Sequence, residues 1–140
     1  MVIAIIAILA VVVFVALNPA GRFADARNAR RWSDVNSILT GIHEFIVDND
    51  GAYPGALAAG MAQTQLGSAA SGCGDDACGT VAACENLSTD LAPYLKSIPI
   101  DPSLAATSTE THYSVAVDAN GIVTVTACDA EAGETIEVSR

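Results

Sequence analysis

The chain opens with residues 1–17, MVIAIIAILAVVVFVAL, a stretch without a charged or polar side chain, a glycine or a proline. The first charged residue is Arg22, so a helix of the preceding 21 residues would be about 30 Å long, close to the hydrocarbon thickness of a bilayer. A cleaved secretory signal would need a basic start and a small-residue cleavage site, and neither pattern is evident. We therefore expect residues 1–21 to be a helical segment of the mature chain that lies in lipid or in another fully apolar environment.

The helical pattern continues beyond this stretch, over residues 22–50, with a different distribution of side chains. Apolar residues recur there at the spacing of one helical face, namely Val35, Ile38, Leu39, Ile42, Phe45 and Ile46. Asn49-Asp50-Gly51 then provides a stop, because glycine adopts positive φ easily, and Pro54 prevents the helix from resuming. The two segments predict one helix of about fifty residues, apolar all round at its start and amphipathic towards its end.

Residues 18–21, Asn-Pro-Ala-Gly, interrupt this long helix. Pro19 has no N–H for the carbonyl group four residues earlier, and its ring crowds that carbonyl, while Gly21 adds backbone freedom. We therefore predict a hinge at Pro19 and Gly21, where the helix bends or unwinds between Leu17 and Phe23.

The outer region, residues 51–140, begins with few large apolar side chains. Residues 55–83 are rich in Ala, Gly, Ser and Thr and are expected to form a surface loop with a short helical piece. Apolar residues from Leu87 to Ile98 again follow a helical period, and Asp90 can serve as the N-cap residue. A second, short helix is therefore predicted in this segment.

The period of the apolar residues changes from 3.6 to 2 near the C-terminus, over residues 112–117, 122–127 and 135–139. Asp118-Ala-Asn-Gly121 is a strong hairpin turn between the first two of these segments. We expect an α+β fold in which a three-stranded antiparallel sheet packs on the amphipathic helix. The strand faces expected to contact Val35, Ile38, Leu39, Ile42 and Phe45 are formed by Tyr113, Val115, Val117, Val123, Val125, Ile136 and Val138.

The charges of this 140-residue chain are unevenly divided. Its net charge is −10, yet residues 1–31 carry four arginines against one aspartate, and the remaining residues carry two cations against fifteen acids. So few clustered cations make a general nucleic-acid binder a poor candidate, and we expect no nucleic-acid partner. The arginines Arg22, Arg27, Arg30 and Arg31 beside Trp32 could form a nucleic-acid or headgroup patch, but a solvated or inter-subunit salt-bridging helix stripe is favoured.

All four cysteines, Cys73, Cys78, Cys84 and Cys128, lie in the acidic part of the chain. An even number in a small domain beyond a membrane segment indicates disulfides and an oxidising compartment. Their spacing matches no zinc or iron–sulfur pattern. Of the three possible pairings we favour Cys73–Cys78 with Cys84–Cys128, and Cys73–Cys84 with Cys78–Cys128 is close behind.

No motif for catalysis or cofactor binding is evident. Neither His43 nor His112 is placed beside a nucleophile by a known pattern, and we expect each to be exposed or satisfied locally. Asp48-Asn-Asp50-Gly51 resembles part of a calcium loop but lacks the later ligands, so a helix stop is favoured. We expect neither an enzyme nor a cofactor.

The nine residues Val2-Ile-Ala-Ile-Ile-Ala-Ile-Leu-Ala10 resemble the apolar N-terminal helix of bacterial type IV pilins and type II secretion pseudopilins. The remaining order agrees, with a long helix, Asp50-Gly-Ala-Tyr-Pro54 closing it, a variable loop and a C-terminal antiparallel sheet. The resemblance implies a subunit made with a basic leader that a prepilin peptidase removes before N-methylation. Because no acidic residue precedes Asp25, we expect the chain to begin inside the family's mature helix. No residue is carried over for cleavage, methylation or the family's Glu–amine pair.

The resemblance implies a structural subunit, as a major pilin, of a type IV pilus-like filament at the cell surface. Such a subunit would lie in the inner (cytoplasmic) membrane before assembly, and its partners would be the assembly machinery and other copies of itself. A helix that is apolar all round must pack against copies of itself outside a membrane. The expected filament core contains Val2, Ile3, Ile5, Ile6, Ile8, Leu9, Val12, Val13 and Phe14.

Two alternatives to the pilus subunit remain. The first is a type II secretion pseudopilin, and some members of that group carry a C-terminal calcium site for which Asp129, Glu131 and Glu134 would be suited. The second is a single-span membrane-anchored protein whose outer domain binds a ligand. Whether a filament serves adhesion, motility or another purpose depends on partners and exposed loops.

Overall fold

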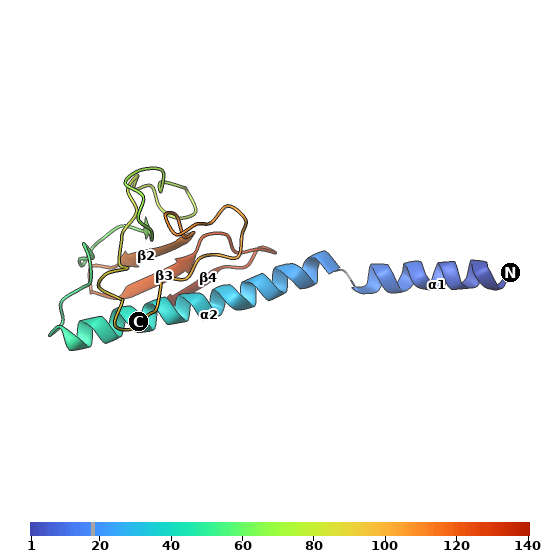
Figure 1. Ribbon diagram of the computed structural model, residues 1–140, viewed down its shortest axis with the longest axis horizontal. Coiled ribbons are helices and arrows are strands. Elements are labelled where there is room, and N and C mark those ends of the chain that lie inside the picture. Colours follow the sequence, from blue (N-terminus) through green and yellow to red (C-terminus); the bar gives the residue numbers. More distant parts are fainter. Residues whose placement is uncertain (18) are drawn as a thin grey trace.

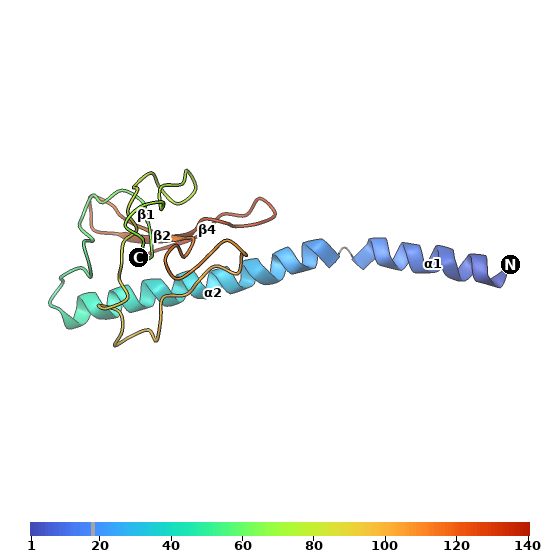
Figure 2. The same cartoon turned by 45° about the horizontal axis from the view of Figure 1, so that its top comes forward.

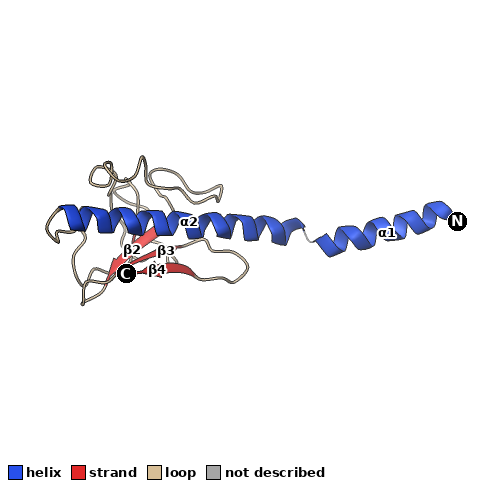
Figure 3. Ribbon diagram, turned by 90° about the horizontal axis from the view of Figure 1, so that it is seen from below, coloured by secondary structure: helices blue, strands red, loops and turns tan. Residues whose placement is uncertain are grey.

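The computed structural model describes residues 1–17 and 19–140. Two helices, α1 (Val2–Leu17) and α2 (Pro19–Asp48), precede four strands, β1 (Thr64–Gln65), β2 (Tyr113–Val117), β3 (Val123–Ala127) and β4 (Ile136–Ser139). Figures 1 and 3 show α1 extending away from the globular part in roughly the direction of α2, while the later part of α2 lies along the sheet. The α+β class predicted from the change of period is confirmed.

The sheet has four antiparallel strands in the order β1-β2-β3-β4, so the prediction of three strands is wrong. The three predicted strands are present as β2, β3 and β4, with Tyr113 opposite Ala127 and Ala127 opposite Ile136. The additional strand β1 lies in the predicted surface loop and pairs Thr64 with Val115. It has only two residues and no apolar alternation, which is why its sequence carries no strand signal.

The core lies between α2 and one face of the sheet. Val35, Ile38, Leu39 and Ile42 of α2 are buried against the alternating side chains Tyr113, Val115, Val117, Val123, Val125, Ala127 and Ile136, and Phe45 and Val138 pack at the edge. Figure 2 shows the sheet with α2 on one side and the loop that contains β1 on the other. The predicted packing face of the helix is therefore confirmed.

The end of α2 follows from its last residues. Gly51 N–H donates to the carbonyl of Ile46 at 2.8 Å, and Asp50 and Gly51 both have positive φ, of 55° and 90°. This is the hydrogen-bond pattern of a helix that is closed by a left-handed residue. The predicted stop is confirmed, although Asp50 takes the left-handed position together with the glycine.

The segment that follows residue 86 does not form the predicted second helix. Residues 88–94 are a series of turns in which Leu91 N–H donates to the carbonyl of Leu87, and Leu95 N–H to that of Leu91. The carboxylate of Asp90, expected to cap a helix, accepts instead from the N–H of Gly55 at 2.6 Å. The apolar side chains of this segment still reach the core, because Leu87 and Leu91 are fully buried.

Candidate functional site

The most exposed apolar surface of the described chain is helix α1. Its large apolar side chains from Val2 to Val15 are 52–83% exposed, and no charged residue lies among them. Eight of the nine expected filament-core residues belong to this set; the side chain of Phe14 lies outside those described. Because these side chains point in every direction around the helix, α1 has no face suited to water.

The predicted hinge falls on the junction of the two helices. Pro19 and Gly21 lie in the first turn of α2, and Asn18 is outside the described residues. Proline is well accommodated at the first position of a helix, because the N–H it lacks would have no helical partner there. Over residues 1–17 and 19–140, no single helix is both long and apolar enough to cross a membrane.

A buried ion pair fixes the first half of α2 to the globular part. The guanidinium of Arg31 donates from Nε to Asp101 Oδ2 at 2.6 Å and from Nη2 to Asp101 Oδ1 at 2.9 Å. Both side chains are at most 1% exposed, and the two residues are 70 positions apart. A bidentate arginine–carboxylate pair fixes orientation as well as distance, so it sets the direction of the first half of α2 relative to the globular part.

A second set of contacts joins the same part of α2 to the turn between β3 and β4. Arg27 donates from Nε and Nη2 to the two carboxylate oxygens of Glu131, each at 2.6 Å. Asn28 and the backbone of Glu131 exchange two hydrogen bonds, of 2.9 and 3.0 Å. Arg31 Nη1 also donates to Glu131 at 3.0 Å. We call these four residues, together with Asp101, the arginine clamp.

The clamp holds its groups in fixed charge states. Hydrogen bonds from Arg27 and then Arg31 lower the pKa of the Glu131 carboxyl group to about 2. The hydrogen bond to Asp101 raises the pKa of the Arg31 guanidinium above its usual range. Near the clamp, burial and a 2.8 Å hydrogen bond to Asp34 raise the pKa of the Tyr113 hydroxyl. At neutral pH Glu131 is therefore ionised and Arg31 is protonated.

The prediction of a solvated or inter-subunit salt-bridging stripe is wrong for Arg27 and Arg31, whereas Arg22 and Arg30 are exposed. Arg27 and Arg31 pair within their own chain, and Arg30 lies 3.6 Å from Asp34 one turn along the helix. Arg22 is exposed and forms no ion pair with the residues that the structure describes. The sequence could not separate these cases, because the partners Asp101 and Glu131 are distant along the chain.

The four cysteines form two disulfides, Cys73–Cys84 and Cys78–Cys128, so disulfide bonding is confirmed and the favoured pairing is wrong. Cys73 N–H donates to the carbonyl of Ala82, which brings the start of the loop beside its end. Cys78 lies near the tip of that loop and contacts the residue that follows β3. The loop therefore folds back on itself, and this separates two cysteines that are close in sequence.

The remaining candidates for a polar or metal-binding site are His112 and the acidic residues near the C-terminus. His112 Nδ1 lies 2.7 Å from Asp129 Oδ2, which confirms local satisfaction of that histidine. The acids suggested for a calcium site are partly engaged, since Asp129 contacts His112 and Glu131 belongs to the clamp. Among the described residues, no group of three or more His, Cys, Asp or Glu is arranged to hold a metal ion.

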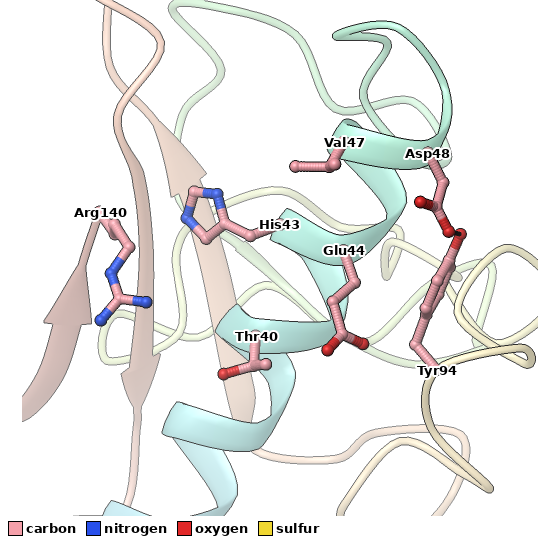
Figure 4. Close-up of a pocket in the computed structure, with 7 residues that line it drawn as sticks. All are labelled: Thr40, His43, Glu44, Val47, Asp48, Tyr94 and Arg140. Carbon is pink, nitrogen blue, oxygen red and sulfur yellow. Dashed lines mark hydrogen bonds between the residues drawn. The ribbon is translucent and has the colours of Figure 1, made fainter.

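A shallow hollow of about 490 Å³ lies at the end of α2 (Figure 4). It is lined by Thr40, His43, Glu44, Val47, Asp48, Tyr94 and Arg140. Asp48 accepts a 2.8 Å hydrogen bond from the Tyr94 hydroxyl, whereas His43 Nε2 is buried and has no partner among the described residues. The hollow joins no nucleophile to an acid or base.

No protein-family model, no curated protein and no solved structure matches this chain. The candidate site is accordingly defined by the chain's own geometry. It consists of the exposed apolar helix α1, joined to α2 and hence to the disulfide-bonded globular part through the arginine clamp.

Proposed function

We propose that this protein is a structural subunit of a type IV pilus-like extracellular filament and that it polymerises through α1. The observation that carries the proposal is the exposure of an uncharged helix on all its sides. Burying a large aliphatic side chain lowers the free energy of assembly by about 1.5–3 kcal/mol. Ten Val, Ile and Leu side chains of α1 are exposed and could be buried in this way. Burial of α1 against other copies is therefore a strong driving force for assembly.

The geometry of α1 favours an open polymer over a closed dimer. A helix with a single apolar stripe can be satisfied by one partner, but a helix that is apolar all round needs several neighbours. Contacts between different surfaces of identical subunits generate a filament when the rotation between them does not close. The globular part would then cover the outside of the filament, attached at the clamp.

The acidic, disulfide-bonded part of the chain belongs in an oxidising compartment outside the cytoplasm. Before assembly, the inner membrane would shelter α1 from water, and the pilus assembly machinery would transfer the subunit into the filament. A type II secretion pseudopilin shares this scheme and is the nearest alternative. A membrane-anchored ligand-binding protein is the second, and the hollow near His43 is the feature that favours it.

The proposal is tested in cells that produce the full chain in its natural genomic setting. Surface structures are sheared off, labelled with antibodies against residues 51–140 and viewed by electron microscopy. We expect labelled filaments in the sheared fraction, and we expect Ile6→Asp in α1 to remove them. Ile122→Asp is the matched control, because Ile122 is also an exposed isoleucine but lies in the β2–β3 hairpin.

Two results would contradict the proposal. Protein confined to the membrane fraction, with no labelled filament, would favour the anchored ligand-binding protein. Filaments that persist in the Ile6→Asp variant would show that α1 is not their core.

A further inference from the structure

Three charged residues of α2, namely Arg22, Asp25 and Glu44, have no partner in the described part of the chain, and Arg22 and Glu44 are of opposite charge. Arg22 and Glu44 are both exposed, and neither forms an ion pair or a side-chain hydrogen bond with residues 1–17 or 19–140. The other arginines near Arg22 are paired with Glu131, Asp34 and Asp101. Arg22 is therefore the cation that remains available at this end of the helix.

Helix geometry places these two charges on nearly the same side of α2. They are 22 residues apart, which corresponds to about 33 Å along the axis and to about six turns with a remainder of roughly 40°. At that distance they cannot pair within one copy. A second copy lying parallel to the first, and shifted by about 33 Å along α2, would bring its Arg22 level with Glu44.

The surface between the two charges can be covered at little cost. The exposed side chains directly between them, Ala26, Ala29, Ser33, Asn36 and Thr40, are small or uncharged, and Asp25 and Arg30 lie at the borders of this stripe. The polar ones bond back to the helix, with Asn36 Nδ2 donating to the Trp32 carbonyl at 2.7 Å and Thr40 Oγ1 to the Asn36 carbonyl at 2.8 Å. Covering this face would therefore leave few hydrogen-bond donors without a partner.

The same shift gives α1 a partner. Displaced by 22 residues, Val2–Leu17 of the second copy lies level with residues 24–39 of the first, which include most of this uncharged face. The docking surface is thus continuous with the apolar surface on which the proposed function rests.

The surroundings of Glu44 suit an incoming guanidinium. Two adjoining hollows, of about 490 and 370 Å³, lie beside Glu44. Thr40, Glu44 and Tyr94 line both of them. Figure 4 shows its carboxylate extending between Thr40 and Tyr94, whereas His43 and Arg140 lie on the opposite side. The nearby Asp48 is engaged by the Tyr94 hydroxyl.

We propose that a second copy of this chain docks along the exposed face of α2, with its Arg22 bound to Glu44, and that this pair sets the stagger between subunits. The inference rests on the proposed filament, for which it specifies the partner and its register. Like charges opposed at an interface are strongly unfavourable, so each reversal repels where the native pair attracts.

The test is a charge exchange in cells that assemble the wild-type filament. We expect Arg22→Glu and Glu44→Arg each to lower the yield of sheared filaments by about tenfold or more, and the double exchange to restore it. Glu137→Arg is the matched control, because Glu137 is an exposed acid on β4, away from this face, and its filament yield should match wild type. Equal urea midpoints for all variants show that folding is intact.

The outcomes separate the two proposals. Wild-type cells without filaments would overturn the proposed function and the docking with it. Wild-type filaments together with an unaffected single variant, or with a double exchange that restores nothing, would overturn the Arg22–Glu44 register and leave the filament proposal standing.

Discussion

Helix α1 and the later half of α2 are both rich in apolar side chains, but only α2 buries them within the chain. Ile42 of α2 is fully buried under the sheet, whereas Ile5 of α1 is 52% exposed. An isoleucine therefore contributes to the folding of the domain in α2, whereas in α1 it remains exposed and available for contacts with other molecules. The contrast separates the part of the molecule that stabilises the domain from the part proposed to build the polymer.

The first half of α2 stands between these two regions and is held by charge. Arg27, Asn28 and Arg31 attach it to Asp101 and Glu131, with no comparable apolar contact before Val35. The clamp therefore decides the direction in which the chain leaves the globular part towards α1. Four substitutions or conditions test this division between the regions.

The largest effect is expected from Arg31→Ala. Removing one partner of this buried ion pair leaves the buried carboxyl group of Asp101 without its partner, which costs about 3–5 kcal/mol of unfolding free energy. The measurement is urea unfolding of the purified full chain in mild detergent, followed by the fluorescence of Trp32, the single tryptophan. Arg30→Ala is the control, because the Arg30 side chain is exposed and its ion pair with Asp34 is long, at 3.6 Å, and we expect a loss below about 1 kcal/mol. Equal losses in both variants would contradict a structural role for the clamp.

The next effect is expected from Ile42→Ala. Truncating a fully buried isoleucine removes its transfer free energy and leaves a cavity, for a loss of about 2–5 kcal/mol. The same urea titration measures it. A loss below about half a kcal/mol would mean that this face of α2 is not the packing face.

The clamp also predicts an acid dependence of stability. Hydrogen bonds from Arg27 and Arg31 hold the pKa of Glu131 at about 2, below its ordinary value of 4.5. A lowered pKa in the folded state adds stability that is fully present above pH 4.5 and is lost as the pH falls towards 2. Urea titrations at several pH values should show the advantage of wild type over Glu131→Gln shrinking across that interval. An advantage that stays constant down to pH 2 would rule out this linkage.

The smallest effect on folding is expected from Ile5→Ala, the match of Ile42→Ala in the exposed helix. Because Ile5 has no partner in the described chain, the unfolding free energy should change by no more than about 0.5 kcal/mol. The yield of sheared filaments should nevertheless fall, since the side chain is proposed to lie in the filament core. A large loss of domain stability would remove the distinction between the two helices.

Much of the fold could be predicted from local patterns. The helical face of α2, its end near Asn49, the hairpin at Asp118–Gly121 and the strands β2 to β4 each follow from residues that are neighbours in sequence. The alternating strand faces also predicted which side of α2 is buried, because an apolar face of one element needs an apolar face of another. The exposed helix that carries the candidate site was identified in the same way.

The errors concern contacts between distant segments. Strand β1 forms only because β2 offers it an edge, and the cysteine pairing depends on a loop that folds back on itself. The segment after Leu87 forms turns instead of the predicted helix, and the carboxylate of Asp90 accepts from the N–H of Gly55 rather than capping its own segment. In each case a partner far along the chain outweighed a local preference.

The sequence by itself determined the periodicity of each segment, and with it the apolar helix, the amphipathic helix and the strands, because periodicity depends only on neighbouring residues. Only the tertiary structure decided that Arg31 is a buried anchor and Arg22 an exposed, unpaired cation. The two arginines lie on one helix and look alike in sequence. What separates them is that folding brings Asp101, 70 residues away, against one and brings no acid against the other within the described chain.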